Sequence, residues 1–511
     1  MLFRALMLGT TLVATAFAAD KSPLTNAPTA FLRQQAVSAV HWQSWTDAVL
    51  AQAKQQPKSV YVFVGSPLSE LTRATINQTF TSEKTVAWLN ENFFCIFVDA
   101  DAQPEVAVYA QHFIATVKQL KGSPVHLWLI PDTLQPYDGA NYLPPSEEWG
   151  KPGYLKAARS ALDTWKAEPA RARALATEAL SMMRLPPLAE TKLALKAKLD
   201  AAAAAWIATI DAKNGGFGSA PKLPEPELIR FLLTRDQAAQ AAALNAARAL
   251  VAGAAHDPVD GGFYRRCIDE EWKEPYYQKT LIDQARIALA LFEAADVAKD
   301  GKLRAAGVGA LDFVLKELRN PDGTFAAALD GTLEENADPA KRPKFVRVGS
   351  ASSAALAQLV VALHRSGEKR LMPLAEKLAE EFPNLDKTRH HFVLAHSGES
   401  GSPPTASDLL SSILVMRAMK DKDGLNETLK LANLAYLDAG AGVYMASLTE
   451  LPMGIAARAP ASGDTPSAEV LALLAGVDEK TAALIRRNLL SQIEYDELPP
   501  GDVLLGLSQT K

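Results

Sequence analysis

Apolar residues in the first third of the chain fall in short continuous runs separated by amphipathic stretches. Strand-like runs rich in β-branched and aromatic residues occupy 60–64, 93–98 and 125–130, and helical patterns occupy 42–54, 82–92 and 105–120. Unbroken apolar runs of this length are typical of strands that are covered on both faces of a sheet. The pattern therefore predicts an α/β domain, which we place at residues 24–165.

The pattern changes after residue 151, where strand-like runs almost disappear. Alanine-rich and leucine-rich helical patterns, punctuated by Pro, Gly and Asp, cover 157–185, 189–210, 228–255, 281–298, 303–318, 352–366, 407–419 and 425–437. Helices separated by such short breaks indicate an array of helical hairpins. We therefore expect an all-α domain over residues 170–511.

The connections between these helices repeat. NGGF at 214–217 recurs as DGGF at 260–263 and DGTF at 322–325, and more loosely as GAGVY at 440–444. Glycine allows a positive φ at such a turn, and the aromatic residue that follows can pack between helices. The spacing favours a closed or curved stack of α-hairpins.

Composition narrows the classes of function. The chain has 511 residues, a net charge of −5 and 48% hydrophobic residues, values that fit a folded protein and give no basic surface for nucleic acid. Its two cysteines, Cys95 and Cys267, are too few for a disulfide scaffold or a cysteine-based zinc site, and we expect both to be unpaired. Nucleotide-binding glycine motifs are absent from the sequence, so we expect neither a metal nor a cofactor.

The first 18 residues have the pattern of a secretory signal peptide. Arg4 precedes an apolar run that ends in small residues at an A-x-A cleavage pattern, and the run is short for a membrane span. We expect cleavage after residue 18, no membrane span afterwards, and an exported protein in the periplasm or outside the cell. An uncleaved anchor is the alternative.

Several motifs together resemble one thioredoxin-like family. They are FLRQQA at 31–36, HWQSW at 41–45, FTSEKTVAWLNENF at 80–93, GGFGSAPKLP at 215–224, GGFYRR at 261–266 and KTLIDQA at 279–285. The combination resembles the family of spermatogenesis-associated protein 20 and the bacterial YyaL proteins. The resemblance implies an α/β thioredoxin-like domain followed by an all-α (α/α)6 toroid of the six-hairpin glycosidase type.

The chain departs from this family at its redox motif, CHWC. The corresponding positions run from Ser69 to Thr72, and a hydroxyl group cannot form the disulfide that thiol exchange requires. We predict a degenerate redox site in which Ser69 or Thr72 caps a helix. Pro124 matches the cis-proline that the family places opposite the helix start.

The densest polar and aromatic segment runs from residue 257 to residue 283. Aromatic rings beside charged groups suit sugar rings, so we expect ligand binding by Arg265, Trp272, Tyr276 and Tyr277. The family segment PHFEKML reads PYYQKTL here, with Tyr276 and Gln278 in place of its His and Glu. Asp283 and Lys279 remain as candidate catalytic groups. Helix capping and surface ion pairs would explain the same residues without a ligand.

Three hypotheses of function follow. In the first, the toroid binds a saccharide or a peptide. In the second, the protein is a carbohydrate-active hydrolase or epimerase that uses Asp283 and a second acid from another hairpin. In the third, the protein is an oxidoreductase, which the family resemblance implies and Ser69 and Thr72 oppose.

Overall fold

The computed structural model describes residues 22–184, 195–331, 342–382, 406–438, 443–444 and 498–509, together with residues 483, 486, 487 and 490. The expected signal peptide, residues 1–18, lies outside the described residues. Among the helices that are described, none is long and apolar enough to cross a membrane.

The N-terminal domain is built on a five-stranded mixed sheet with the order β1-β3-β2-β4-β5. Strand β3 pairs in parallel with β1 and β2, whereas β4 pairs antiparallel with β2 and β5. The strands are β1 (Gln43–Ser44), β2 (Ser59–Gly65), β3 (Phe93–Asp99), β4 (Val125–Leu129) and β5 (Pro136–Ala140). The three strand-like runs of the sequence are therefore the three central strands.

Helices cover both faces of this sheet. Along β2, Tyr61 and Phe63 belong to one apolar cluster, whereas Val60 and Val62 belong to another. Alternate residues of a strand point to opposite faces, so both faces are buried, as the unbroken apolar run predicts. The helices are α1 (Ala30–Gln34), α2 (Asp47–Ala53), α3 (Glu70–Ala74), α4 (Glu83–Asn92), α5 (Pro104–Lys118), α6 (Tyr154–Ala167) and α7 (Pro169–Met182).

The N-terminal domain extends further than the predicted residue 165. Helix α7 packs on β5 and α5, and its buried residues Ala172, Ala176 and Ala179 belong to the apolar clusters of the sheet. The continuous helical pattern at 157–185 hides the break that Pro169 makes between α6 and α7. We therefore place the end of this domain near residue 184.

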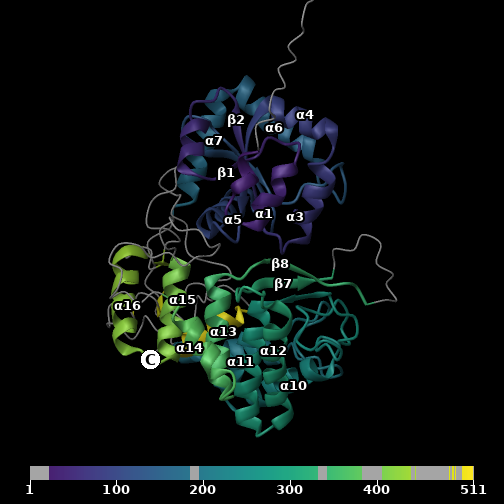
Figure 1. The fold of residues 1–511 in the computed structure, drawn as a ribbon, viewed down its shortest axis with the longest axis vertical. Helices are drawn as coiled ribbons and strands as arrows, with labels where there is room; N and C mark the ends of the chain where they lie inside the picture. Colours follow the sequence, from purple (N-terminus) through teal and green to yellow (C-terminus); the bar gives the residue numbers. More distant parts are fainter. Residues whose placement is uncertain are drawn as a thin grey trace, which may run out of the picture.

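The second domain is the expected toroid, built from helical hairpins that lie below the N-terminal domain in Figure 1. Within the described part of the chain, five inner helices pack in the spatial order α15, α13, α11, α9 and α19, and helices such as α10, α12, α14 and α16 pack against them as hairpin partners. The bounds are α8 (Leu195–Ile207), α9 (Pro226–Leu233), α10 (Gln237–Ala252), α11 (Leu281–Ala298), α12 (Gly301–Phe313), α13 (Ser353–Ser366), α14 (Met372–Ala379), α15 (Ala406–Ala418), α16 (Lys422–Tyr436) and α19 (Gly501–Gln509). The predicted fold class, an α/β thioredoxin-like domain followed by an α/α toroid, is confirmed.

One predicted helix is two helices. The pattern that begins at residue 228 continues without Pro or Gly as far as Ala252, but the chain turns between α9 and α10, where Asp236 caps α10 by accepting a hydrogen bond from the Ala239 amide. Aspartate is among the strongest N-cap residues, and its side chain competes with helix continuation. The break is therefore local chemistry that apolar periodicity does not record.

The repeated glycine turns have the same geometry. Gly215, Gly216, Gly261 and Gly262 all have positive φ, and the aromatic residues after them form β-bridges to residues just before each turn. The fourth repeat, 440–444, lies mostly outside the described residues. These turns sit in long loops that each lead into the N-terminus of an inner helix, so they gather at one end of the toroid.

A small antiparallel sheet lies at the same end. Its order is β6 (Gln278–Thr280), β7 (Ala326–Asp330), β8 (Val346–Ser350), and β6 leads directly into α11. Figure 1 shows β7 and β8 directly beside the edge of the N-terminal domain at which α3 lies. A short pair of strands, β9 (Leu437–Asp438) and β10 (Val443–Tyr444), completes the described strands.

Candidate functional site

The degenerate redox segment starts helix α3. Ser69 is the N-cap residue, and its hydroxyl oxygen accepts a hydrogen bond of 3.2 Å from the Thr72 backbone amide. The predicted capping role is confirmed for Ser69. The hydroxyl group that stands at the first cysteine position of the family motif is thus used to begin the helix.

Thr72 and Pro124 lie across from one another, as the resemblance implies. The Thr72 hydroxyl is 3.5 Å from the Ser123 hydroxyl, and the Ser123–Pro124 peptide bond is cis. Thr72 is fully buried, and its methyl group fills the space above Gly65. This geometry retains the frame of a thioredoxin site with two hydroxyl groups where sulfur would be needed.

Both cysteines are unpaired and buried away from this segment. Cys95 lies in β3, and Cys267 lies in a loop of the toroid. Burial raises the pKa of Cys95 well above its usual range and that of Cys267 to about 12. Since the thiolate is the reactive form, neither group is prepared for thiol chemistry.

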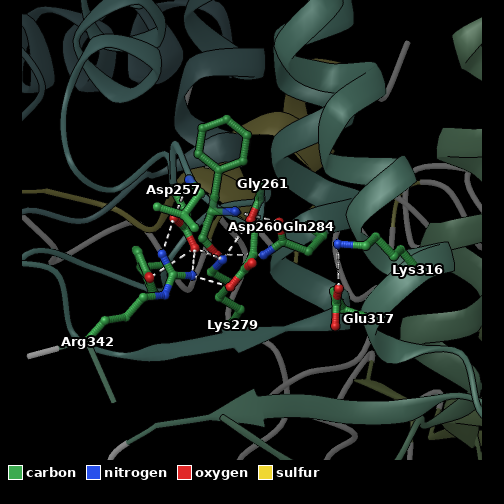
Figure 2. A network of polar contacts seen from close by, with 11 residues as sticks. Asp257, Asp260, Gly261, Lys279, Gln284, Lys316, Glu317 and Arg342 are labelled. Atoms are coloured by element: carbon green, nitrogen blue, oxygen red, sulfur yellow. Dashed lines mark hydrogen bonds and ion pairs between the residues drawn. The ribbon is translucent and has the colours of Figure 1, made fainter. Parts of the chain in front are cut away.

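The segment 257–283 contains a buried ion-pair network centred on Asp257 (Figure 2). The Lys279 ammonium donates hydrogen bonds to Asp257 Oδ2 at 2.5 Å and to the Gly261 carbonyl oxygen at 2.6 Å. Arg342 Nη1 donates to Asp257 Oδ1 at 2.8 Å, and Tyr264 donates its hydroxyl proton to Asp257 Oδ2 at 3.1 Å. The side chains of Asp257 and Lys279 are each only 1% exposed.

This network keeps Asp257 ionised. Burial by itself would raise the pKa of the Asp257 carboxyl, but the hydrogen bonds from Arg342 and Lys279 lower that pKa well below its usual range. Lys279 Nζ also lies 4.6 Å from the ring centre of Tyr264 and 4.5 Å from that of Phe313, which favours the ammonium ion. Lys279 therefore stabilises the glycine turn through Asp257 and the Gly261 carbonyl oxygen, and the charges of Lys279 and Asp257 neutralise each other.

The preceding glycine turn repeats this arrangement. Lys222 Nζ donates to Asp211 Oδ2 at 2.9 Å and to the Gly218 carbonyl oxygen at 2.7 Å, and the Lys222 side chain is fully buried. An aspartate before the turn and a buried lysine after it thus recur in two hairpins. The repetition indicates that Lys279 stabilises its turn, as Lys222 does.

The two candidate catalytic residues are not paired with each other. Asp283 lies in the first turn of α11, where the Thr280 hydroxyl donates to Asp283 Oδ2 at 2.6 Å and accepts from the Asp283 amide at 3.1 Å. Lys279 is the residue before Thr280, and its side chain points to Asp257 instead (Figure 2). Thr280, which lies between Lys279 and Asp283 in the sequence, is the N-cap residue of α11.

The candidate ligand-binding residues occupy three different environments. Trp272 is 3% exposed, and its indole N–H donates to the Gly215 carbonyl oxygen at 3.2 Å, so its ring packs inside the fold. Tyr277 packs edge-on against Tyr264 beside the Asp257 network. Arg265 donates to the Gln278 side-chain oxygen at 3.2 Å.

Tyr276 lies at the contact between the two domains. Its hydroxyl donates to Glu70 Oε2 at 3.0 Å, and its ring lies 4.3 Å from the Arg266 guanidinium carbon. The neighbouring Gln278 contacts the N-terminal domain as well, through a hydrogen bond of 3.0 Å to the Leu68 carbonyl oxygen. The structure thus places the altered family segment of the toroid against the altered redox segment.

A group of carboxyl side chains at the start of the inner helices is absent from the sequence-based candidates. Burial of Glu225, together with the nearby carboxylates of Glu227 and Asp502, raises the pKa of Glu225 to about 7. Glu227 forms an ion pair of 3.1 Å with Arg286 of α11. Glu225 itself has a φ of 46°, an uncommon backbone conformation for a residue with a side chain.

Sequence reasoning missed this group because its members come from separate helices. Glu225 and Glu227 flank Pro226 at the start of α9, whereas Asp502 belongs to α19 near the end of the chain. The unusual Glu-Pro-Glu sequence is the signal that could have drawn attention to α9. Within the described ranges, no three His, Cys, Asp or Glu side chains are arranged to hold a metal ion.

Comparisons with known proteins match this two-part structure. The family model for a protein of unknown function, DUF255, matches residues 21–184. Spermatogenesis-associated protein 20 of Mus musculus is 28% identical over 325 residues, which cover 60% of this chain and 40% of the mouse protein. The Homo sapiens protein is 28% identical over 346 residues, covering 64% of this chain and 42% of the human protein.

The chain therefore spans about two fifths of the length of these curated relatives. Among solved structures, a cellobiose 2-epimerase from Bacillus thermoamylovorans aligns with a TM-score of 0.45 and 12% identity, covering 58% of this chain and 86% of that one. The family resemblance seen in the sequence motifs is confirmed: residues 21–184 match the model of the DUF255 family, and the chain is similar to spermatogenesis-associated protein 20.

Proposed function

We propose that this chain is an exported protein without thiol–disulfide activity, whose toroid binds a saccharide or a peptide where the inner helices begin. The observation that carries the proposal is the Glu225 carboxyl, whose pKa of about 7 reflects burial beside Glu227 and Asp502. Carboxyl groups with strongly shifted pKa values cluster at functional sites. The long loops of the toroid gather at this same end and would surround a ligand.

The chemistry of this group suits donors of hydrogen bonds. Ionised carboxylates accept hydrogen bonds from the hydroxyl groups of a saccharide, or from the amide and ammonium groups of a peptide. Arg286, already paired with Glu227, adds a guanidinium that can donate to a ligand oxygen. Such a mixed set recognises a polar ligand without negative charge better than a phosphate or a nucleic acid.

Ligand screening tests the proposal. The full chain is applied to a glycan array and a peptide array, and hits are measured by calorimetry with the parent protein, Glu225→Gln and the control Glu376→Gln. Glu376 lies on the outer helix α14 and is exposed. We expect the affinity to fall about tenfold or more for Glu225→Gln, as for loss of a charged hydrogen-bond partner, and to stay unchanged for the control. No hit on either array would refute the proposal.

The second candidate function is a carbohydrate-active enzyme, a hydrolase or an epimerase. It is favoured by the same Glu225 pKa of about 7, because a carboxyl group that is protonated near neutral pH can act as a general acid. Asp283, at the start of the neighbouring inner helix, is the candidate for the second carboxylate. Turnover of any array hit, followed by NMR, should vanish in both Glu225→Gln and Asp283→Asn if this candidate is right.

Oxidoreductase activity is not proposed. Ser69 uses its hydroxyl oxygen to cap α3, and both thiols of the chain are buried elsewhere. Thiol exchange needs an accessible thiolate and a second sulfur. Reduction of insulin disulfides by the purified protein, at a rate above that of buffer with dithiothreitol, would contradict this part of the proposal.

Export is proposed from the sequence pattern of residues 1–18. Expression of the full chain with a C-terminal tag should give a periplasmic or secreted product whose N-terminus begins after residue 18. A variant that lacks residues 2–18 should remain in the cytoplasm. Recovery of the full-length protein in the membrane fraction would instead support an uncleaved anchor.

A further inference from the structure

The contact between the two domains is made by the degenerate redox segment. Leu68 and Arg73, beside and within α3, contact the small sheet β6-β7-β8 of the toroid, and Glu70 of α3 contacts Tyr276 just before β6. Figure 1 shows the two domains meeting at this edge. The segment at which a thioredoxin-like domain would carry its reactive group faces another part of the same chain.

A buried carboxylate of the toroid receives its cation from the N-terminal domain. Asp330 of β7 is fully buried, and its Oδ2 atom lies 3.1 Å from Arg73 Nη2. A buried carboxylate without a partnering charge is strongly destabilising. Arg73 also donates to the Pro67 carbonyl oxygen at 2.8 Å, so its guanidinium is held in place from its own domain.

Gln278 links Asp330 of the toroid to Leu68 of the N-terminal domain. Its side-chain amide nitrogen donates to Asp330 Oδ2 at 2.7 Å and to the Leu68 carbonyl oxygen at 3.0 Å. Both partners are acceptors, so the position requires a donor group. Glutamate, the residue that the family motif has here, would place its carboxylate against Asp330 and a carbonyl oxygen, and like charges at this distance repel strongly.

The altered residues of the two domains therefore fit each other. Tyr276 and Gln278 stand where the family motif has His and Glu, and they contact Glu70 and Leu68 of the altered redox segment. The Tyr276 hydroxyl supplies a donor for the Glu70 carboxylate across the contact, and Gln278 supplies a donor for the Leu68 backbone carbonyl oxygen. These contacts indicate that the altered segments of the two domains form the two sides of one interface.

We propose that the former redox face of the N-terminal domain is a permanent docking surface for β6-β7-β8 of the same chain, with Gln278 and Arg73 as its positioning residues. The two domains consequently form one rigid unit with a fixed relative orientation. Because β6 leads directly into α11, this docking fixes the N-terminal domain over the end of the toroid where the inner helices begin. The inference does not depend on which ligand, if any, the toroid binds.

Distances between spin labels test the docking in the full chain. Lys84 of α4 and Lys302 of α12 are exposed, one on each domain, and can be replaced by cysteine for labelling, while both native thiols are buried. In the doubly labelled background we expect one narrow distance distribution by pulsed EPR. A broad background distribution would overturn the proposal, since it would show domains that move independently.

Two variants, one on each side of the contact, probe the mechanism. Arg73→Met removes the cation for Asp330 and should broaden the distribution at least twofold. Gln278→Glu should be broad at pH 8.5 and narrow at pH 5, where a proton on the new carboxyl group restores a donor. A role of Gln278 limited to folding of the toroid would give no such pH dependence.

The matched control is Gln240→Glu. Gln240 donates to two carbonyl oxygens at the α9–α10 turn, within the toroid and away from the N-terminal domain. This substitution makes the same chemical change and should leave the distance distribution as narrow as in the background. Identical distributions for the background, Arg73→Met and Gln278→Glu at both pH values would overturn the proposal, because the contact would then not depend on the residues that define it.

Discussion

The Asp257 network allows a sharp prediction, because its two buried charges have different numbers of other partners. Asp257 accepts hydrogen bonds from Lys279, Arg342 and Tyr264, whereas the Lys279 ammonium has Asp257 and one carbonyl oxygen. Removal of either partner leaves the other in a buried site. The cost should therefore be unequal for Asp257→Asn and Lys279→Met.

Loss of the aspartate charge is the larger perturbation. In Asp257→Asn the neutral side chain keeps its shape, but the buried Lys279 ammonium loses its counter-charge and keeps the Gly261 carbonyl oxygen and three aromatic rings as neighbours. Removing one partner of a buried ion pair costs about 3–5 kcal/mol. We expect the free energy of unfolding to fall by an amount in this range.

Loss of the lysine charge should cost less. In Lys279→Met the apolar chain is nearly retained, and Asp257 keeps the hydrogen bonds from Arg342 and Tyr264. The loss is then one charged hydrogen bond, about 1–3 kcal/mol. Lys316→Met is the control, because the Lys316 side chain is 70% exposed in its ion pair with Glu317 and removal of such a surface charge should leave stability unchanged (Figure 2).

Equilibrium unfolding in urea, followed by circular dichroism of the toroid helices, measures these differences. The pKa of Asp257 is lowered in the folded state, so its contribution is present above the ordinary value of 3.8 and is lost as the pH falls. The gap between the parent protein and Asp257→Asn should consequently stay constant above about pH 5 and narrow as the pH falls through 3.8 and below. Equal costs for the two substitutions, or a larger cost for Lys279→Met, would refute Asp257 as the centre of the network.

Three further predictions concern titration, reactivity and the glycine turns. Because the pKa of Glu225 is raised to about 7, the folded state of the parent protein holds a proton that its unfolded state releases. As the pH rises from 5 to 8, the parent protein should therefore lose stability relative to Glu225→Gln, as measured by urea unfolding. A difference in unfolding free energy between the two proteins that does not change with pH would contradict this prediction. Cys95 and Cys267 should not react with a thiol reagent in the native protein, and both should react in denaturant. Gly262→Ala should lose more than about 1 kcal/mol, since its φ is 71° and a Cβ atom would lie 2.6 Å from the Phe313 ring. Gly309→Ala, in a helix with open space, should gain about 0.5–1 kcal/mol, and equal thermal shifts for both would contradict the turn geometry.

The sequence predicts those parts of the fold that depend on local pattern. The apolar runs at 60–64, 93–98 and 125–130 coincide with β2, β3 and β4, because a strand buried on both faces needs apolar residues at every position. The glycine turns were predicted for a similar reason, since a positive φ favours glycine. Helix breaks at Pro169 and Asp236 were missed because periodicity continues across them.

Side-chain partners depend on the fold itself and were predicted poorly. Lys279 and Asp283 are four residues apart and look like a pair, but Thr280 caps α11 between them and the lysine points from β6 to Asp257. Trp272 looked like a ligand-stacking ring, yet the close approach of Gly216 and Gly253 encloses it. Neither outcome follows from composition or spacing.

The end of the toroid at which the loops gather is held together by ion pairs at three levels. Within a turn, Lys279 pairs with Asp257; between inner helices, Arg286 pairs with Glu227; between domains, Arg73 pairs with Asp330. Each pair restricts how its partners can be arranged, because an alternative arrangement would leave a charge without its counter-ion.

Asp257, which is partnered in this way, is a poor candidate for proton transfer, since hydrogen bonds from Arg342 and Lys279 keep it ionised. Glu225 differs, because burial and two neighbouring carboxylates bring its pKa to about 7, where a small change in surroundings alters its charge. A ligand that donates a hydrogen bond to Glu225 would favour the ionised form and release a proton. Binding at this end of the toroid should therefore be linked to pH near neutrality, whereas the docking of the N-terminal domain through Arg73 should not.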